Sequence, residues 1–349
     1  MENHRAIKSF FLKQSSLSLM GNCCSTSSDS SIHPVQLTTP LTNDNIGRAA
    51  HLWYKDPAQA AAEYGRIEGW DTSEVTDMNN LFEGQTYFND DISMWDVSRV
   101  TTMTGVFRSA SAFNQDLSRW DVSRVKFMTA IFSGAIAFNQ DLSGWDVSRV
   151  TDMFGVFCDA TAFNQDISGW NVSRVVNMSH MFHGAVSFNQ DLSAWDVSKV
   201  INMDGMFHGA ISFNQDMTGW NVSAVMNMSC MFSGATSFNQ DLSGWDVSRA
   251  IFMDSMFAFA TSFNQDLSGW DVRRIMRVSD MFLATTALTK TLQRTMHVSS
   301  FFDGVYRHMP REKRRQAFAG AFAWQRRKAF LIFLVNHGYL YSASAPSNY

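Results

Sequence analysis

Cysteine and proline are scarce in this chain, with 4 Cys and 5 Pro among 349 residues. Cys23 and Cys24 are adjacent, whereas Cys158 and Cys230 stand far apart, so their spacing fits neither a disulfide framework nor a metal site. The sequence therefore predicts free thiols. An uninterrupted apolar run of about 18 residues, which a membrane-spanning helix requires, is also lacking.

Basic residues are not in excess either, because 28 Lys and Arg stand against 32 Asp and Glu, a net charge of −4. Nucleic-acid-binding domains usually carry a clear basic excess, so the charge balance argues against nucleic acid as a partner. The sequence has no P-loop, no dinucleotide-binding G-x-G-x-x-G and no H-E-x-x-H, and its scattered histidines lack a matching nucleophile. It predicts a protein that is not an enzyme and that has no cofactor and no metal site.

What the chain does have is a period of 25 residues, kept without a slip. It is marked by Trp70, Trp95, Trp120, Trp145, Trp170, Trp195, Trp220, Trp245 and Trp270. A fixed period of this length is the signature of a stacked-repeat protein, in which each unit buries its apolar face against its neighbours. The Trp, Phe, Met and Leu columns are therefore expected to form a continuous core rather than a ladder that binds a ligand.

One unit, residues 145–169, divides into two halves with different apolar spacing. In the first half, apolar residues recur at i, i+3, i+6, i+7 and i+10 from Val150, which predicts a helix of about three turns with Ser148 as its N-cap. Small residues such as Gly184 near the end of this half are expected to break the helix. The second half, residues 163–170, alternates apolar and polar side chains, which is typical of a short strand.

Polar residues also form columns. An Asn column, with Gln beside it, is expected to make a hydrogen-bonded ladder between units. Its members are Asn114, Asn139, Asn164, Asn189, Asn214, Asn239 and Asn264. Two Asp columns would repel each other's carboxylates unless these were neutralised, and the predicted partner is the column that includes Arg99 and Arg149. Calcium is the alternative, but the G-G-x-G-x-D pattern of calcium-binding solenoids is missing.

These patterns predict an α/β solenoid, leucine-rich-repeat-like, of about nine 25-residue strand-plus-short-helix units with helical caps at both ends. The repeat occupies residues 70–294. Helical spacing after a Thr-Asn-Asp N-cap signal at 42–44 predicts a helical N-terminal cap over 41–69, in which an Asp-Pro pair at 56–57 starts a second helix. Residues 1–40 are rich in Ser and Thr and are predicted to be disordered.

The C-terminal segment, residues 295–349, combines helical spacing with eight Lys or Arg residues between Arg307 and Lys328. It is predicted to form a basic amphipathic helical cap and tail. Three alternatives stay open, since such a helix can dock on the last repeat unit, lie on an anionic membrane or a calmodulin-like partner, or contact nucleic acid.

The N-terminal segment holds a pattern for lipidation. Read from Met20 as a start, residues 20–25 match M-G-x-x-x-S. Gly21 would then be a candidate for myristoylation and Cys23 and Cys24 for palmitoylation, and two lipid chains give stable membrane anchoring. The hypothesis requires translation to start at Met20, and the alternative is chance in a Ser-rich segment. The segment shows no convincing signal peptide.

The repeated unit W-D-V-S-x-V-x-x-M-x-x-M-F-x-x-A-x-x-F-N-Q-D-L-S-x resembles that of the BspA-like leucine-rich-repeat surface-protein family, in its 25-residue variety. Residues 170–192 carry the pattern almost intact, and the match runs through 70–294. The resemblance implies a leucine-rich-repeat-like solenoid that serves as a surface or adhesion module, with no catalytic residues to carry over. It implies a cell-surface location, whereas the lack of a convincing signal peptide favours a cytoplasmic or membrane-tethered protein.

Together, the sequence and the resemblance predict a non-catalytic recognition module that presents an extended surface to a protein or glycan partner. The alternative is a membrane-tethered intracellular scaffold. Positions that vary between units are the candidates for a recognition face, because they are expected to face solvent. Two columns contain them, with Phe154, Ser179, Asp204, Ser229 and Asp254 in the first and Arg108, His183 and His208 in the second.

Overall fold

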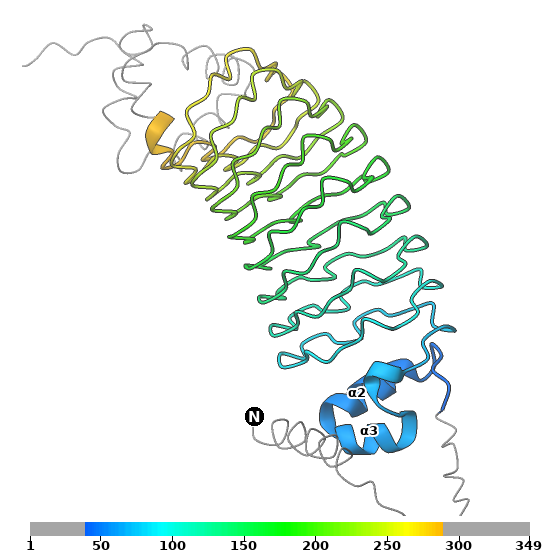
Figure 1. Cartoon of the computed structure of the whole chain (residues 1–349). Coiled ribbons are helices and arrows are strands. Elements are labelled where there is room, and N and C mark those ends of the chain that lie inside the picture. Colours follow the sequence, from blue (N-terminus) through cyan, green and yellow to red (C-terminus); the bar gives the residue numbers. More distant parts are fainter. Residues whose placement is uncertain (1–38, 289–349) are drawn as a thin grey trace, which may run out of the picture. The chain divides into compact units, whose positions relative to one another are not determined.

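The computed structural model describes residues 39–288, so predictions that concern 1–38 and 289–349 fall outside the described residues. The described part begins with helices and continues as a stack of 25-residue coils, which are coloured from cyan to yellow in Figure 1. The helical elements before the coils are α2 (Ile46–Lys55), α3 (Pro57–Tyr64) and the 3-10 turn η2 (Ile67–Gly69).

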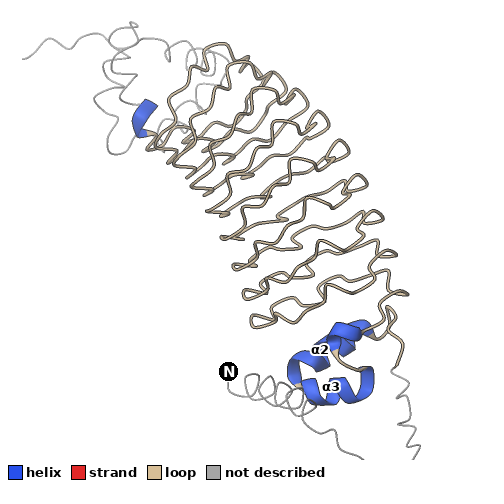
Figure 2. Ribbon diagram, viewed as in Figure 1, coloured by secondary structure: helices blue, strands red, loops and turns tan. Residues whose placement is uncertain are grey.

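Neighbouring coils are joined at equivalent positions by isolated parallel β-bridges. An unbroken series of bridges runs from Asp77↔Thr102 to Phe252↔Arg277. Each residue bridges to the one 25 positions later, so the register of the stack equals the period of the sequence. Figure 2 shows that, within residues 39–288, the bridges do not lengthen into strands and the coils contain no helix before the short helical segment 286–288, where the described part ends.

The helix predicted in the first half of each unit is wrong, because residues 150–160 form consecutive tight turns. The N–H of Gly155 points out of its own coil and donates to the carbonyl of Ser179 in the next coil at 3.0 Å. Every second residue of this stretch donates to the next coil in the same way. The amides between them close short turns, as from Cys158 N–H to Gly155 O at 3.1 Å. An α-helix would pair all of these donors within its own segment. The apolar spacing therefore reflects successive turns rather than a helix.

Two columns of left-handed residues shape these turns. In the first column φ lies between 53° and 62° for Asn80, Gly105, Ala130, Gly155, His180, Gly205, Cys230, Ser255 and Asp280. The second column, four residues later, includes Gly184 and Asp159, with φ of 65° and 55°. The left-handed conformation costs a non-glycine residue roughly 1–2 kcal/mol, and the hydrogen bonds between coils offset this cost. The glycines predicted to end a helix supply left-handed backbone instead.

The strand predicted at 163–170 is also misplaced, because the bridge of this coil lies at Asp152. Residues 163–170 are joined to the preceding coil by side-chain hydrogen bonds. The Oδ1 atom of Asn139 accepts from the N–H of Asn164 at 2.9 Å, and Gln165 Nε2 donates to Asn139 O and Oδ1, both at 3.1 Å. The same three bonds recur in coil after coil, so the predicted ladder is confirmed. We call the row from Asn89 to Asn264 the Asn ladder.

Aromatic side chains fill the interior of the coils. Trp170 is 3% exposed, and its Nε1–H donates to Leu142 O of the preceding coil at 3.0 Å. Phe157 stacks on Phe163 of its own coil, with ring centroids 3.8 Å apart, and on Phe182 of the next coil at 5.7 Å. The prediction that the Trp and Phe columns form a continuous core is confirmed.

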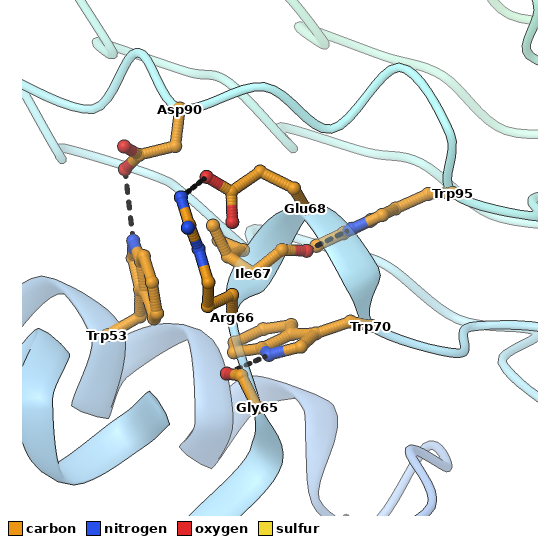
Figure 3. Close-up of polar contacts among 8 residues, drawn as sticks. All are labelled: Trp53, Gly65, Arg66, Ile67, Glu68, Trp70, Asp90 and Trp95. Atoms are coloured by element: carbon orange, nitrogen blue, oxygen red, sulfur yellow. Dashed lines mark hydrogen bonds and ion pairs between the residues drawn. The ribbon is translucent and has the colours of Figure 1, made fainter. Parts of the chain in front are cut away.

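The segment before the coils supplies the first coil with the groups that a preceding coil would supply. Trp95 donates its Nε1–H to Ile67 O of η2 at 2.8 Å, 28 residues back, which is the spacing that later tryptophans use (Figure 3). Trp70 donates to Gly65 O at 3.0 Å and meets Trp53 of α2 edge-on, with ring centroids 6.0 Å apart. The turn η2 therefore stands in for the end of a coil.

Helices α2 and α3 form where helical spacing predicts them, although one cap differs. Asp56 caps α3 as predicted, with its Oδ1 accepting the N–H of Gln59 at 3.0 Å. Helix α2 follows Asn45 rather than a cap within 42–44. Asn43 instead accepts the N–H of Thr76 at 2.9 Å, which ties this segment to the first coil.

Candidate functional site

The side of the coils that carries the bridges is accessible to solvent, and its residues change from coil to coil. We call it the bridge face, made of the bridge column, the column before it and the column two residues after it. The bridge column itself consists of Asp77, Thr102, Phe127, Asp152, Asn177, Asn202, Asn227, Phe252 and Arg277. Each of these is exposed or half-buried. The bridge face therefore combines a uniform backbone with varied side chains.

An open groove of about 660 Å³ runs along the bridge face over five coils. Its apolar lining comes from Phe127 and Val176, whose exposed fractions are 52% and 41%. The remaining lining residues are Thr, Asn and one Asp, which is Asp152. The groove is thus nearly uncharged and exposes large apolar side chains.

The polar residues of the groove are engaged in holding the backbone. Asn79 Oδ1 accepts the N–H of Thr104 at 2.8 Å. Asp152 Oδ1 accepts the N–H of Phe154 at 2.9 Å and the Nδ2–H of Asn177 at 3.1 Å. These side chains are needed because the turn after the bridge points the N–H groups of Thr104 and Phe154 away from the next coil. A side-chain oxygen therefore has to accept each of them. What the groove offers to a ligand is therefore mainly its apolar surface.

The first predicted recognition column belongs to the bridge face, but its members differ in exposure. Phe154 is 43% exposed and contacts the His180 ring edge-on at 5.6 Å. Ser179 is 3% exposed, so the prediction that it faces solvent is wrong, and its hydroxyl donates to Asn177 Oδ1 at 2.7 Å. Asp204, Ser229 and Asp254 are half-buried. The groove is lined by Thr104 and Thr129 from this column and by none of the predicted members.

The second predicted column lies at a corner of the coils. Arg108 pairs with Glu83 of the preceding coil, with Nε 2.9 Å from Oε1. His183 and His208 occupy equivalent positions in adjoining coils, with ring centroids 4.6 Å apart. His180 joins them, since its Nδ1 lies 3.3 Å from Nδ1 of His183. Burial lowers the pKa of both His183 and His208. The structure thus gathers three histidines that the sequence did not pair.

Three overlapping stretches of the chain match one family model, described as "Mycoplasma protein of unknown function, DUF285". They are residues 55–168, 140–236 and 215–303, and together they cover more than half of the chain. The chain belongs to this family. The tandem matches confirm the repeat, whereas the leucine-rich-repeat relationship stays a prediction. Neither a curated protein nor a solved structure matches the chain.

In this DUF285 chain the Asp columns are satisfied within each coil, and the predicted Arg–Asp ladder is wrong for the residues that the structure describes. Asp146 Oδ1 accepts the N–H of Ser148 at 3.0 Å, so the Ser predicted as an N-cap is the donor. Hydrogen bonds from Ser148 are the main reason why the pKa of Asp146 is lowered, and the charge of Arg149 contributes least. Arg99 of the predicted column pairs with Glu74 at 2.6 Å.

The lipidation candidates of this DUF285 chain, Gly21, Cys23 and Cys24, lie outside the described residues, as does the basic segment 295–349. Within residues 39–288, no helix is long and apolar enough to cross a membrane. The membrane-tether hypothesis therefore stays a prediction.

The thiols of the coils, Cys158 and Cys230, are free and half-buried. Burial raises the pKa of Cys158 to about 11 and, in the same direction, the pKa of Cys230. Both thiols therefore hold their protons at neutral pH. Among the described residues, no group of three or more His, Cys, Asp or Glu side chains is placed to hold a metal ion.

Proposed function

We propose that this DUF285 protein is a non-catalytic recognition module that binds a protein or glycan partner on its bridge face. In this proposal the coils form a leucine-rich-repeat-like solenoid, as the resemblance to the BspA-like family implies. The observation that carries the proposal is the open groove in which Phe127 and Val176 expose large apolar side chains. Apolar surface within a groove is typical of a binding site, because its burial by a partner is favourable.

The fold does not require these apolar residues. The position of Phe127 is occupied by Thr102 in the preceding coil and by Asp152 in the following one, and the parallel bridge forms at each of them. The position of Val176 is likewise occupied by Thr151 one coil earlier. A side chain that the backbone does not need, and that is exposed at a cost in hydration, is better explained by a partner than by folding.

The charge of the groove favours a neutral partner. Asp152 is the one charged residue among those that line it. Nucleic-acid binding depends on Lys and Arg contacts to phosphate, which this lining does not offer. Burial of apolar surface is also screened little by salt, so we expect binding to change only slightly between low and moderate ionic strength.

The proposal is tested with the purified chain as bait, against native extract and against a glycan array. The groove variant is Phe127→Thr/Val176→Thr, which uses residues found at equivalent positions of other coils. The control is Ile136→Thr/Ile211→Thr, which changes two exposed side chains outside the groove to the Thr found in the same column at Thr161.

A partner held by the wild type and the control but released by the groove variant supports the proposal. Sensitivity of the captured material to protease or to glycosidase then assigns the partner to protein or glycan. If every partner binds the groove variant as well as it binds the wild type, the groove is not the recognition site.

A further inference from the structure

Three histidines meet at the corner of two adjoining coils, apart from the groove. His180 and His183 are three residues apart within one tight turn, and His208 follows His183 in the next coil. All three are half-buried, so water and small ions reach them while their rings are partly desolvated. The turn directs the Nδ1 atoms of His180 and His183 toward one another, 3.3 Å apart.

We propose that His180 and His183 chelate a divalent transition-metal ion of the zinc class through their two Nδ1 atoms. Zinc binds imidazole nitrogen at about 2.0–2.1 Å and prefers tetrahedral angles, which places two nitrogen ligands about 3.3–3.4 Å apart. The observed separation of 3.3 Å equals this distance, so each ring needs only a rotation that turns its Nδ1 lone pair from the other histidine toward a shared metal ion. Imidazole nitrogen suits zinc, copper and nickel, and it is a poor ligand set for calcium or magnesium.

The ring of His180 is positioned by two neighbours. Phe154 of the preceding coil contacts it edge-on, with ring centroids 5.6 Å apart. Gly205 of the following coil leaves room for it, because a Cβ at position 205 would lie 2.7 Å from Nδ1 of His180. The ring of His180 is therefore held in place by residues of both adjoining coils, which supplies part of the preorganisation that a chelate needs.

Further ligand positions are open to water and to neighbouring side chains. His208 stacks beside His183, with ring centroids 4.6 Å apart. The carboxylate of Asp159 and the charge of Asp204 act on these histidines and favour a bound cation. Since no three such side chains converge on one point within 39–288, the site is a two-nitrogen chelate completed by water or by a rotation of His208.

The inference is tested by titrating the full-length, metal-free chain with Zn²⁺ and measuring stoichiometry by calorimetry, with the zinc-induced shift of the melting temperature as a second readout. His180→Asn and His183→Ser remove one ligand each, and both new residues stand in the same columns of other coils, at Asn80 and Ser133. His51→Gln, an exposed position on α2, controls for unspecific binding to histidine. We expect each of the first two variants to lose one equivalent of Zn²⁺ and His51→Gln to lose none from this site.

A second pair of variants keeps every histidine. Gly205→Ala places a Cβ against Nδ1 of His180, whereas a Cβ at position 155 of the same column makes only ordinary contacts, the nearest 3.6 Å from Cys158. Both glycines have φ near 60°, and the column accommodates alanine at Ala130. We expect Gly205→Ala to lose the zinc equivalent and Gly155→Ala to keep it, while circular dichroism shows both to be folded.

Two results overturn the proposal. One is that folded His180→Asn and His183→Ser bind as much Zn²⁺ as the wild type. The other is that Gly205→Ala and Gly155→Ala bind Zn²⁺ equally, which would show that zinc binding does not depend on the position of Nδ1 of His180.

Discussion

The Asn-ladder side and the bridge face of each coil are joined to the next coil by different groups. On the Asn-ladder side a side chain makes the connection, as from Asn164 N–H to Asn139 Oδ1, and the same residues return in coil after coil. On the bridge face the backbone bridges make it in every coil, side-chain bonds such as that between Asn177 and Asp152 add to it in some, and Phe127, Asp152 and Arg277 occupy equivalent positions. A column is invariant where a side chain binds its own copy, and it varies where the backbone suffices.

The difference separates structure from recognition within one 25-residue unit. The interior and the Asn-ladder side fix the stack, so their residues cannot change without loss of a hydrogen bond or of core packing. The bridge face is free to change, and the groove and its exposed apolar residues are found there. The corner of the coils that carries the three histidines is equally free to change, because the column of His183 and His208 holds Arg108, Ser133 and Cys158 in other coils.

The largest expected effect is on the interior. Trp170→Ala should lower the free energy of unfolding by about 3–5 kcal/mol, because it leaves a cavity and removes the donor to Leu142 O. Chemical denaturation followed by circular dichroism measures it. The bridge-face substitution Phe127→Ala is the control and should change little. An unchanged midpoint for Trp170→Ala would place this side chain outside the core.

The core and the Asn ladder could be predicted from the sequence because they depend on residue identity at a fixed period. The sequence did not distinguish the successive turns in the first half of each unit from a helix. Apolar spacing of three and four residues fits both, and the decisive feature is the left-handed backbone at Gly155 and Asp159. The bridge at Asp152 leaves no mark in the sequence, since it is made by the backbone.

The candidate site was predicted only in part, for related reasons. Variation between units indicated the column of Phe154, but the columns of Phe127 and Val176 vary as much and were not singled out. The pairing of His180 with His183 needs the tight turn between them, in which residues three apart face one another. A helical interpretation of the same residues hides that contact.

The second-largest expected effect is on the Asn-ladder side. Asn164→Ala should cost about 1–3 kcal/mol, because it leaves the part-buried N–H of Asn189 without its acceptor and removes one of the two acceptors of Gln190 Nε2. Phe127→Thr on the bridge face is the control, since Thr102 fills the equivalent position and the Phe side chain makes no hydrogen bond that could be lost. Denaturation midpoints of the two variants measure the contrast. Equal losses would mean that both sides depend on their side chains.

Acidic pH should have a smaller effect on stability for each residue involved. The pKa of Asp146 and Asp196 is lowered by hydrogen bonds from Ser148 and Ser198. A lowered folded pKa stabilises the protein above the unfolded value near 3.9, and this contribution is lost as the pH falls through the folded value. We therefore expect the melting temperature to fall below about pH 4.

Asparagine provides the control for this acid effect. Asn171 stands in the same column and accepts the N–H of Ser173 at 3.2 Å, so the turn does not need a charge. Asp146→Asn/Asp196→Asn should keep most of its stability at pH 7 and lose less of it at pH 3. A loss at pH 3 as large as that of the wild type would assign the acid sensitivity to other groups.

The smallest expected effect is on the bridge face. Phe127→Thr/Val176→Thr should change the free energy of unfolding by no more than about 0.5 kcal/mol, because both side chains are largely exposed and the bridges are made by the backbone. The removal of exposed apolar surface should also raise solubility. Denaturation midpoints of this variant and of Ile136→Thr/Ile211→Thr should agree. If the groove variant were clearly less stable, Phe127 and Val176 would belong to the structure, and the argument that assigns them to recognition would fail.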